Sequence, residues 1–354
     1  MRHCFAVSSG KAALVLILQA LHDLSPDRDE VLIPAYTCYS VPSAIVKAGL
    51  RVRLCDVSRE TLDFDYGRLA EEIDNPRLLA VVPNHLFGLP SDVARVRDMV
   101  RGRGIFVIED AAQAMGAQWN GRKLGTQGDA GLFSMGRGKA FATVEGGILL
   151  TDDDRIGRAI GNRLSTFEEY GGLEKIKLLV YALVLAALIH PSWFWLPKSL
   201  PFLKLGETLF DTSFPLRKLS AFQSGLARSW KERSAAFRKA RAKNVEKLAG
   251  CGVPAVGVTG ERAPDLIRYP ILLPDKVAKQ ALLRKSGEMG LGIADGYPDS
   301  IDGIVELGFR AQGKVFPAAQ EIVERLLTLP VHPFVNERDI GKIVKLLKSI
   351  MGRG

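Results

Sequence analysis

Short apolar runs rich in β-branched residues alternate with stretches of helical periodicity in the first part of the chain. The runs occupy 31–34, 52–57, 78–82, 105–108 and 148–150. This alternation predicts an α/β domain built on a largely parallel sheet with helices on both faces. Because ligands of such sheets bind at the carboxyl ends of the strands, the residues that directly follow each run are the first candidates for a site.

From about residue 220 onward the pattern changes to longer helical stretches around one strand. Helices are expected over about 220–248, 276–289, 318–327 and 337–351, and a strand over 267–273. This arrangement predicts a smaller α+β domain. We therefore expect a large domain over 1–219 and a small C-terminal domain over 220–354.

One segment has no polar face. Residues 178–189, with the sequence LLVYALVLAALI, carry no charge, and Trp193 and Trp195 follow shortly after them. Twelve helical residues extend about 18 Å, whereas the hydrocarbon core of a bilayer is about 30 Å thick, so a membrane-spanning helix is not expected. Two interpretations stay open: a buried core helix, or a hairpin over 178–197 that dips into one leaflet with its tryptophans at the headgroups.

Composition places the chain among ordinary folded proteins. Its 354 residues are 47% hydrophobic and 25% charged, which excludes a disordered or collagen-like chain. The four cysteines have neither paired spacing nor a spacing suited to zinc, so reduced thiols and no metal site are expected. This favours the cytosol, because the apolar stretch 12–21 also lacks the cleavage site of a secretory signal.

The net charge of +9 is concentrated in one segment. Residues 217–243 hold nine Lys and Arg against the single acid Glu232. On one helix, an arc of about 140° would hold Arg228, Lys231, Arg238, Lys239 and Lys243. Two interpretations stay open: a solvated helix face, or a surface that meets the phosphates of a substrate or of anionic lipid. Nucleic acid is not among the expected partners.

Two glycine loops that contain a lysine are not nucleotide-binding loops. The sequences SGK at 9–11 and GRGK at 136–139 resemble part of a P-loop, but Phe5 and Phe133 stand where its first glycine belongs. Neither lysine is followed by Ser or Thr. No GxGxxG opens a helix after a strand either, so a nicotinamide cofactor is only weakly indicated.

A different cofactor accounts for more of these residues. Asp110 ends an apolar run, where a carboxylate can keep a pyridine nitrogen protonated, and Lys139 lies on a glycine-rich loop, where an amine can form an imine. Ser134 and a helix N-terminus can hold a phosphate. These are the requirements of pyridoxal 5′-phosphate (PLP). Alone, the lysine could be an exposed loop residue and the aspartate a helix cap, but their occurrence together favours the cofactor.

Motifs along most of the chain, outside about 168–213, stand in a familiar order. They occupy 34–45 (PAYTCYSVPSAI), 84–92 (NHLFGLPSD), 109–153 (beginning EDAAQAMG and containing GRGKAFATVEGG), 219–233 and 316–333. Their order and spacing resemble those of the DegT/DnrJ/EryC1/StrS aminotransferases. These are fold-type-I PLP enzymes, best known for aminating nucleotide-linked keto-sugars. The resemblance implies a mainly parallel central sheet and a smaller C-terminal α+β domain.

The resemblance also implies roles for the matching residues. Lys139 would form the imine with PLP, Asp110 would pair with its pyridine nitrogen, and Gln113 would contact the ring hydroxyl side. Tyr36 or Tyr39 is a candidate to stack on the ring, since Cys38 stands where an aromatic residue is common. The phosphate would lie against Gly10, Lys11 and Ser134, and the candidate substrate contacts are His85, Glu145 and His332. A structural role for His85 is an equal alternative.

Besides Cys38, the sequence departs from the family pattern in three places. Lys11 replaces the usual Thr of the phosphate turn, which offers a cation in place of a hydroxyl. The sequence LRK at 216–218 replaces the N-Y-R motif, whose Asn reaches the phosphate of the neighbouring subunit, so Arg217 or Lys218 would have to supply charge there. The stretch over 168–213 is longer than usual and holds the apolar run.

The resemblance finally implies an activity. The enzyme would move an amino group from an amino acid, commonly L-glutamate, to a nucleotide- or lipid-linked keto-sugar in surface polysaccharide or glycolipid biosynthesis. A cytoplasmic homodimer with active sites at the subunit interface is implied, and peripheral contact with the inner membrane face through 178–197 and 217–243 is a hypothesis. Two alternatives stay open: a PLP-dependent sugar dehydratase, in which a His replaces the imine-forming Lys, and a catalytically silent, membrane-associated regulatory protein.

Overall fold

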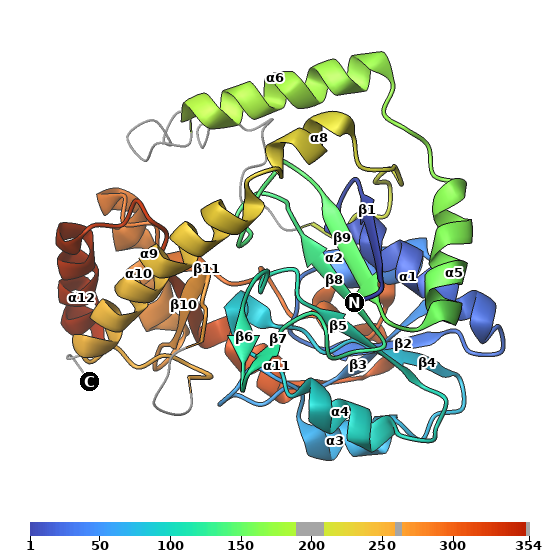
Figure 1. Cartoon of the computed structure of the whole chain (residues 1–354). Coiled ribbons are helices and arrows are strands. Elements are labelled where there is room, and N and C mark those ends of the chain that lie inside the picture. Colours follow the sequence, from blue (N-terminus) through green and yellow to red (C-terminus); the bar gives the residue numbers. More distant parts are fainter. Residues whose placement is uncertain (189–208, 259–263, 352–354) are drawn as a thin grey trace.

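A seven-stranded sheet forms the centre of the computed structural model, which describes residues 1–188, 209–258 and 264–351 (Figure 1). Its strands are β1 (His3–Val7), β2 (Glu30–Pro34), β3 (Arg51–Cys55), β4 (Leu78–Val81), β5 (Phe106–Asp110), β8 (Ala130–Ser134) and β9 (Gly147–Thr151), in the order β1-β9-β8-β5-β4-β2-β3. From β3 across to β8 every pair is parallel, whereas β9 is antiparallel to both β8 and β1. The largely parallel sheet predicted from the sequence is confirmed.

Helices cover both faces of this sheet. They are α1 (Gly10–Leu24), α2 (Ser40–Lys47), α3 (Tyr66–Glu72), α4 (Val93–Val100) and α5 (Asp154–Ser165). Val31 and Ile33 of β2 pack in one apolar cluster with α1 and α2, while Leu32 packs in a second cluster with α3 and α4. Because successive strand residues point to opposite faces, this division explains why the strand reads as an uninterrupted apolar run.

Two strands of the sheet are not evident from the sequence pattern. β1 (HCFAV) and β8 (AGLFS) contain few β-branched residues. Both are fixed by β9, which pairs with each of them over five residues. Strand pairing, rather than local propensity, therefore forms this antiparallel edge.

The C-terminal part is a small α+β unit, as expected. The strands β10 (Arg268–Leu272), β12 (Leu326–Pro330) and β11 (Ala294–Asp295) form an antiparallel sheet, flanked by α9 (Trp230–Gly250), α10 (Lys276–Met289), α11 (Pro317–Arg325) and α12 (Glu337–Met351). The helix expected over 318–327 ends at Arg325, because the next residues form the central strand of this sheet. The domain boundary at 219/220 stays a prediction.

The long basic helix expected over 220–248 is in fact two helices. α8 (Ala221–Leu226) begins with a capping box formed by Ser220 and Gln223, and α9 begins only at Trp230. Arg228 lies between them, so the predicted single arc of five cations is wrong. Two cations of this segment are also engaged by the protein itself: Arg238 forms an ion pair with Asp265, and Arg241 is buried.

The apolar segment forms α6 (Gly172–Leu188), which lies along the outside of the molecule (Figure 1). Among its described side chains only Leu178 is buried, and Leu183 is 62% exposed. The interpretation as a buried core helix is therefore wrong for the single chain. The remainder of the hypothetical hairpin, residues 189–197, lies outside the described residues. In the described part of the chain, no helix combines the length and hydropathy that crossing a membrane requires.

Candidate active site

The ends of neighbouring strands bring the predicted catalytic residues together. Asp110 is the last residue of β5, and its backbone pairs with that of Asn84, which follows β4. Ser134 ends β8, next to β5 in the sheet. Lys139 lies on the loop that leads from β8 to β9, and its positive charge acts to lower the pKa of Asp110. The residues predicted from the ends of the apolar runs thus lie at the ends of neighbouring strands.

Asp110 is a buried carboxylate with few partners. Its Oδ1 accepts one hydrogen bond, from the backbone N–H of Ala112 at 2.9 Å. Burial raises the pKa of Asp110, although the Ala112 N–H and the nearby Lys139 ammonium oppose that shift. A cation beside this carboxylate would therefore stabilise its charged form.

Helices α8 and α9 hold the Lys139 loop from the opposite side. Arg241 Nη1 donates to the carbonyl oxygen of Ala140 at 3.3 Å, and Gln223 Nε2 donates to that of Glu145 at 2.9 Å. The guanidinium of Arg233 lies 4.9 Å from the centre of the Phe141 ring. These contacts therefore fix the part of the loop that directly follows the lysine, and sequence analysis missed the residues that fix it.

The N-terminus of α1 meets the end of β8 in a narrow cradle. Ser9 caps the helix by accepting from Ala12 N–H, and a Cβ on Gly10 would lie only 2.8 Å from Cβ of Ser134. Within the described residues, no acceptor is found for the backbone N–H groups of Gly10 and Lys11. Free helix N-terminal amides beside a hydroxyl suit a phosphate.

The ammonium of Lys11 is partly engaged elsewhere. Its Nζ lies 3.4 Å from Oδ2 of Asp211 and 4.1 Å from the centre of the Phe214 ring. Both partners lie shortly before α8, so residues 211–214 cover the Lys11 side of the cradle. The backbone N–H of Lys11 can therefore donate to an anion, whereas its ammonium group already forms an ion pair with Asp211.

Gln113 is oriented by two hydrogen bonds. Its Oε1 accepts from Phe87 N–H at 2.7 Å, and its Nε2 donates to the hydroxyl of Tyr297 at 2.8 Å. Tyr297 comes from the C-terminal part, is buried, and stacks on Phe87 with ring centres 6.2 Å apart. Sequence analysis missed Tyr297, because no local pattern links it to a site formed by the first 140 residues.

Tyr36 has a different place from the one predicted. It is 1% exposed, its ring lies 5.6 Å from that of Tyr297, and its hydroxyl accepts from Tyr297 N–H at 3.2 Å. A Cβ on Gly296 would overlap this hydroxyl. These contacts place Tyr36 where the large domain packs against the C-terminal part, and they favour a packing role over stacking on a cofactor.

The contacts of His85 favour the structural alternative over a contact with substrate. Its Nδ1 accepts from Ser91 N–H at 3.0 Å, which leaves Nε2 to donate to Oε1 of Glu109 at 2.8 Å. Both side chains are fully buried. With both ring nitrogens engaged, no hydrogen-bonding atom of the ring is free for a ligand.

The two other predicted substrate contacts differ in position. Glu145 lies on the Lys139 loop. The loss of water around its carboxyl group raises the pKa of Glu145, and the positive charges of Arg137 and Lys11 oppose that shift. His332 does not join the site: its ring packs 6.0 Å from that of Phe334, and its carbonyl oxygen accepts from Asn244. Burial and the nearby Arg268 lower the pKa of His332. Glu145 stays a candidate, whereas the structure does not support His332.

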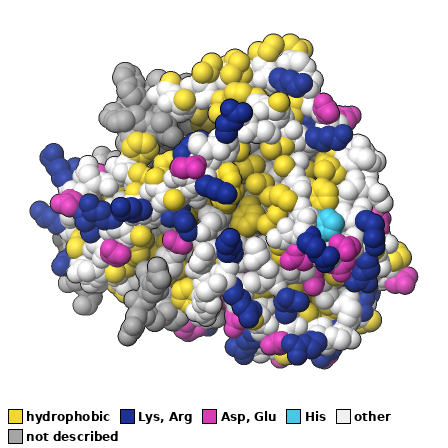
Figure 2. All heavy atoms as spheres, viewed as in Figure 1, with side chains coloured by type: hydrophobic (Ala, Val, Ile, Leu, Met, Phe, Trp, Pro, Cys, Tyr) yellow, Lys and Arg dark blue, Asp and Glu magenta, His cyan; other side chains and the backbone are white. Residues whose placement is uncertain are grey.

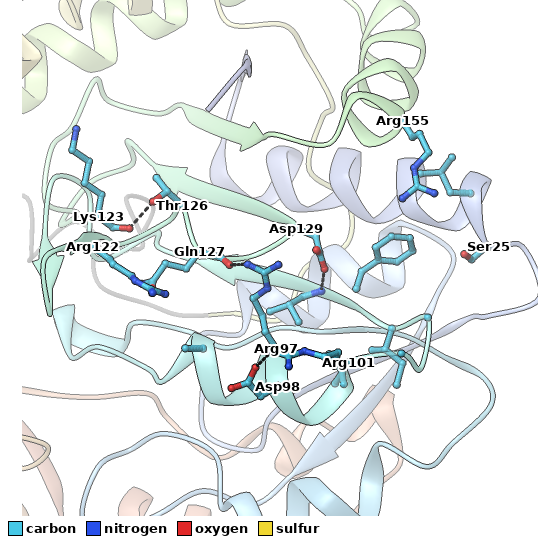
Figure 3. A pocket seen from close by; sticks show the side chains of 18 residues that line it. Ser25, Arg97, Asp98, Arg101, Arg122, Lys123, Thr126, Gln127, Asp129 and Arg155 are labelled. Carbon is cyan, nitrogen blue, oxygen red and sulfur yellow. Dashed lines mark hydrogen bonds and ion pairs between the residues drawn. The ribbon is translucent and has the colours of Figure 1, made fainter.

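A hollow of about 1160 Å³ lies apart from this site (Figure 3). It is lined by cations from α4 and the residue after it, from β7 (Arg122–Lys123) and from the start of α5, namely Arg97, Arg101, Arg122, Lys123 and Arg155. None of the predicted cofactor or substrate residues lines it. The hollow and the Asp110–Lys139 site are therefore separate features.

Comparison with known proteins agrees with this geometry. Residues 1–173 match the model of the DegT/DnrJ/EryC1/StrS aminotransferase family. The spore coat polysaccharide biosynthesis protein SpsC of Bacillus subtilis is 27% identical over 99% of this chain and 86% of its own length. UDP-N-acetyl-3-dehydro-α-D-glucosamine 3-aminotransferase of Acidithiobacillus ferrooxidans is 27% identical over 99% of this chain and 84% of its own. GDP-4-keto-6-deoxy-D-mannose 3-dehydratase of Yersinia pseudotuberculosis is 33% identical, but over only 44% of this chain and 40% of its own.

The fold is shared with solved structures as well. PseC of Helicobacter pylori, an aminotransferase involved in the biosynthesis of pseudoaminic acid, superposes with a TM-score of 0.78 at 16% identity, over 100% of this chain and 88% of its own. A likeness at that identity establishes the fold alone. Taken with the family model and the full-length relatives, it leads to one conclusion: the chain belongs to the DegT/DnrJ/EryC1/StrS aminotransferase family.

Proposed function

We propose that the protein is a PLP-dependent aminotransferase that moves an amino group from L-glutamate to a keto-sugar carried on a nucleotide or a lipid. The product would serve surface polysaccharide or glycolipid biosynthesis. The observation that carries this proposal is the meeting of the buried Asp110, the Lys139 loop and the Gly10–Ser134 cradle at the carboxyl ends of β5 and β8.

The residues present fit PLP in charge and in hydrogen-bonding capacity. The free amides of Gly10 and Lys11 with the Ser134 hydroxyl would hold the phosphate, and Asp110 would face the pyridine nitrogen. Gln113 keeps one Nε2 hydrogen unused by Tyr297, which could reach the ring hydroxyl. When bound, PLP supplies an aldehyde that condenses with amines and a ring that withdraws electrons.

The side chains have distinct tasks in this proposal. Asp110, whose charge is costly to bury alone, holds a proton on the pyridine nitrogen and so keeps the ring cationic. Lys139 Nζ, once freed by the incoming amino acid, takes the proton from Cα of the donor and later returns one to the acceptor carbon. Arg241, Gln223 and Arg233 keep that amine in place by fixing its loop.

A sugar dehydratase on the same fold is the second candidate. The family resemblance predicts a His in place of the imine-forming Lys in such enzymes, and this chain has Lys139. A protein without catalytic activity would have no need to retain Lys139, Asp110 and Ser134 together at the positions that the family motif requires. Lys139 therefore favours transamination over both alternatives.

A homodimer with active sites at the subunit interface is part of the proposal. Of the two residues that could replace the missing Asn, Arg217 is already held by Glu168 and Glu174, with Nη2 to Oε1 of Glu174 at 2.6 Å. Lys218 pairs through its backbone with Val7 and has no ion-pair partner among the described residues. Lys218 is thus the better candidate to reach a partner's phosphate.

Borohydride trapping tests the cofactor assignment directly. Reduction of the PLP-loaded protein followed by peptide mapping should place the label on Lys139, and Lys139→Ala should lose both the label and the visible absorbance of the bound cofactor. Lys123→Ala, on the exposed β7, is the matched control. A label on another lysine would refute the assignment.

A substrate panel tests the reaction class. Purified enzyme is incubated with ¹⁵N-glutamate and nucleotide- or lipid-linked keto-sugars, and products are read by mass spectrometry. Transamination places ¹⁵N in the sugar. A deoxygenated sugar without ¹⁵N would instead establish the dehydratase, and the absence of any product with a labelled Lys139 would favour the silent protein.

A further inference from the structure

Helix α6 presents an apolar surface to solvent. Six large side chains of this helix are exposed, and they are Leu173, Ile176, Leu179, Val180, Leu183 and Val184. Figure 2 shows hydrophobic side chains along the upper edge of the molecule, where α6 lies in Figure 1. Contiguous apolar surface of this kind usually marks a site of contact with another protein or with a membrane.

The exposed side chains share one side of the helix. At about 100° per residue, all six fall within an arc of about 140°. Lys175 and Lys177 lie just beyond the two opposite margins of this arc, each within about 40° of it, and both are exposed without an ion-pair partner among the described residues. An apolar face bordered on both sides by lysines is the pattern of a helix that lies in a membrane interface.

The opposite side of α6 attaches it to the protein. Glu174 accepts from Arg217 Nη2 at 2.6 Å, Leu178 is buried, and the ring of Tyr181 lies 5.2 Å below the guanidinium carbon of Arg137. Arg137 belongs to the same loop as Lys139. The helix is therefore held beside the catalytic loop while its apolar side faces outward.

We propose that α6 docks this enzyme on a bilayer that contains anionic phospholipid, with the helix axis in the plane of the interface. The two marginal lysines favour this occupant over a second copy of the chain, because they would meet lipid phosphates at both edges of the buried face. The contact between Tyr181 and Arg137 then places the Lys139 loop close to the lipid surface. Docking goes beyond the proposed transamination and does not depend on it.

Co-sedimentation with vesicles tests the apolar face. The full-length protein should pellet with phosphatidylcholine vesicles that contain phosphatidylglycerol, and Ile176→Glu/Leu183→Glu should abolish pelleting. Val277→Glu/Val305→Glu is the matched control: it adds the same charge at two valines that are 74% and 88% exposed in the C-terminal part. Equal pelleting of the two double variants would overturn the proposal.

The lysines are tested separately. Lys175→Gln/Lys177→Gln should weaken binding to anionic vesicles about tenfold or more. Lys345→Gln/Lys348→Gln, which removes two exposed lysines of α12, should leave binding unchanged. Binding should also fall in high salt.

Misfolding and self-association are distinguished from lipid docking by separate readouts. Circular dichroism confirms that each variant is folded, and labelling of Lys139 by borohydride reports on the cofactor site independently of lipid. Sedimentation velocity measures the oligomer. If Ile176→Glu/Leu183→Glu dissociates an oligomer and the unmodified protein does not bind vesicles, α6 is an interface between copies and the proposal fails.

Discussion

Gln113 and Tyr297 lie 184 residues apart in the sequence and are joined by a hydrogen bond of 2.8 Å from Nε2 to the hydroxyl. This bond connects the loop after β5 to the C-terminal part of the chain. The position of Gln113 in the proposed cofactor site therefore depends on a residue of the C-terminal part. Burial raises the pKa of Tyr297 well above its usual value, and the hydroxyl therefore stays protonated across the physiological range.

Tyr297→Phe should destabilise the protein by about 1–2 kcal/mol, because it removes one buried hydrogen bond without creating a large cavity. It should also lower the affinity for PLP, since the amide of Gln113 loses one of the two contacts that orient it. Urea unfolding and a PLP titration followed by absorbance measure the two effects.

Tyr269→Phe is the control, because it removes a buried hydroxyl that lies away from the site and donates to the carbonyl oxygen of Val253. Equal PLP affinity in the two variants would contradict the positioning role.

The pair of His85 and Glu109 gives a prediction about acid stability. Burial alone would raise the pKa of Glu109, but hydrogen bonds from His85 and from the backbone of Gln127 and Gly125 outweigh it, and the net shift is downward from 4.5. Because the pKa of Glu109 is lower in the folded protein than in the unfolded chain, its ionised carboxylate stabilises the fold at pH values above the unfolded-state pKa. This contribution is lost as the pH falls through the folded-state pKa.

Glu109→Gln should therefore lower the free energy of unfolding at pH 7 and flatten its dependence on pH below about 4.5. Chemical unfolding at several pH values measures both. His85→Phe should cost about 1–3 kcal/mol by leaving Glu109 Oε1 without one donor. The folded fraction of that variant should still accept the borohydride label at Lys139. Loss of the label in a folded His85→Phe protein would restore a role for His85 in the site.

The sequence predicts most of this fold where local patterns agree with tertiary packing. The helices over 276–289 and 337–351 have the expected bounds, and Asp110 ends a strand of the sheet, as its place after an apolar run indicates. The expected helix over 318–327 is too long because residues 326–330 pair with two other strands, an interaction that no local pattern contains.

The site was predicted less completely than the fold. His85 and Tyr36 both stand at strand ends, yet each is engaged by partners distant in the sequence, Glu109 and Tyr297. A sequence motif predicts where a residue lies on its strand or loop, but not which distant residue its side chain forms a hydrogen bond with. For the same reason, the uniform apolar run at 178–189 did not distinguish a helix buried in the core from one exposed on the surface.

The cradle between Gly10 and Ser134 can be closed by a single methyl group. In Gly10→Ala the new Cβ would lie 2.8 Å from Cβ of Ser134, so α1 and β8 must separate. Overpacking of this size costs about 1–3 kcal/mol, and the phosphate site should be distorted with it. Thermal unfolding and PLP binding should both weaken. Gly225→Ala, in α8, meets no atom within 4 Å and should change neither; a similar loss in both variants would show that the cradle is not special.

The buried Arg241 should matter more for the position of Lys139 than for stability. Its Nη1 donates to the carbonyl of Ala140, its Nε has no partner among the described residues, and burial lowers its pKa, so the ion gains little from its surroundings. Arg241→Met keeps the length of the side chain and removes a costly buried charge, which should leave the free energy of unfolding within about 1–2 kcal/mol of the original. The Ala140 carbonyl then loses its donor, and the loop should move. We therefore expect slower borohydride labelling of Lys139 in the PLP-loaded variant at unchanged fold.

Lys239→Met, on the exposed side of α9, is the control and should label at the original rate. Unfolding of Arg241→Met, or labelling as fast as in Lys239→Met, would show that the arginine does not position the loop.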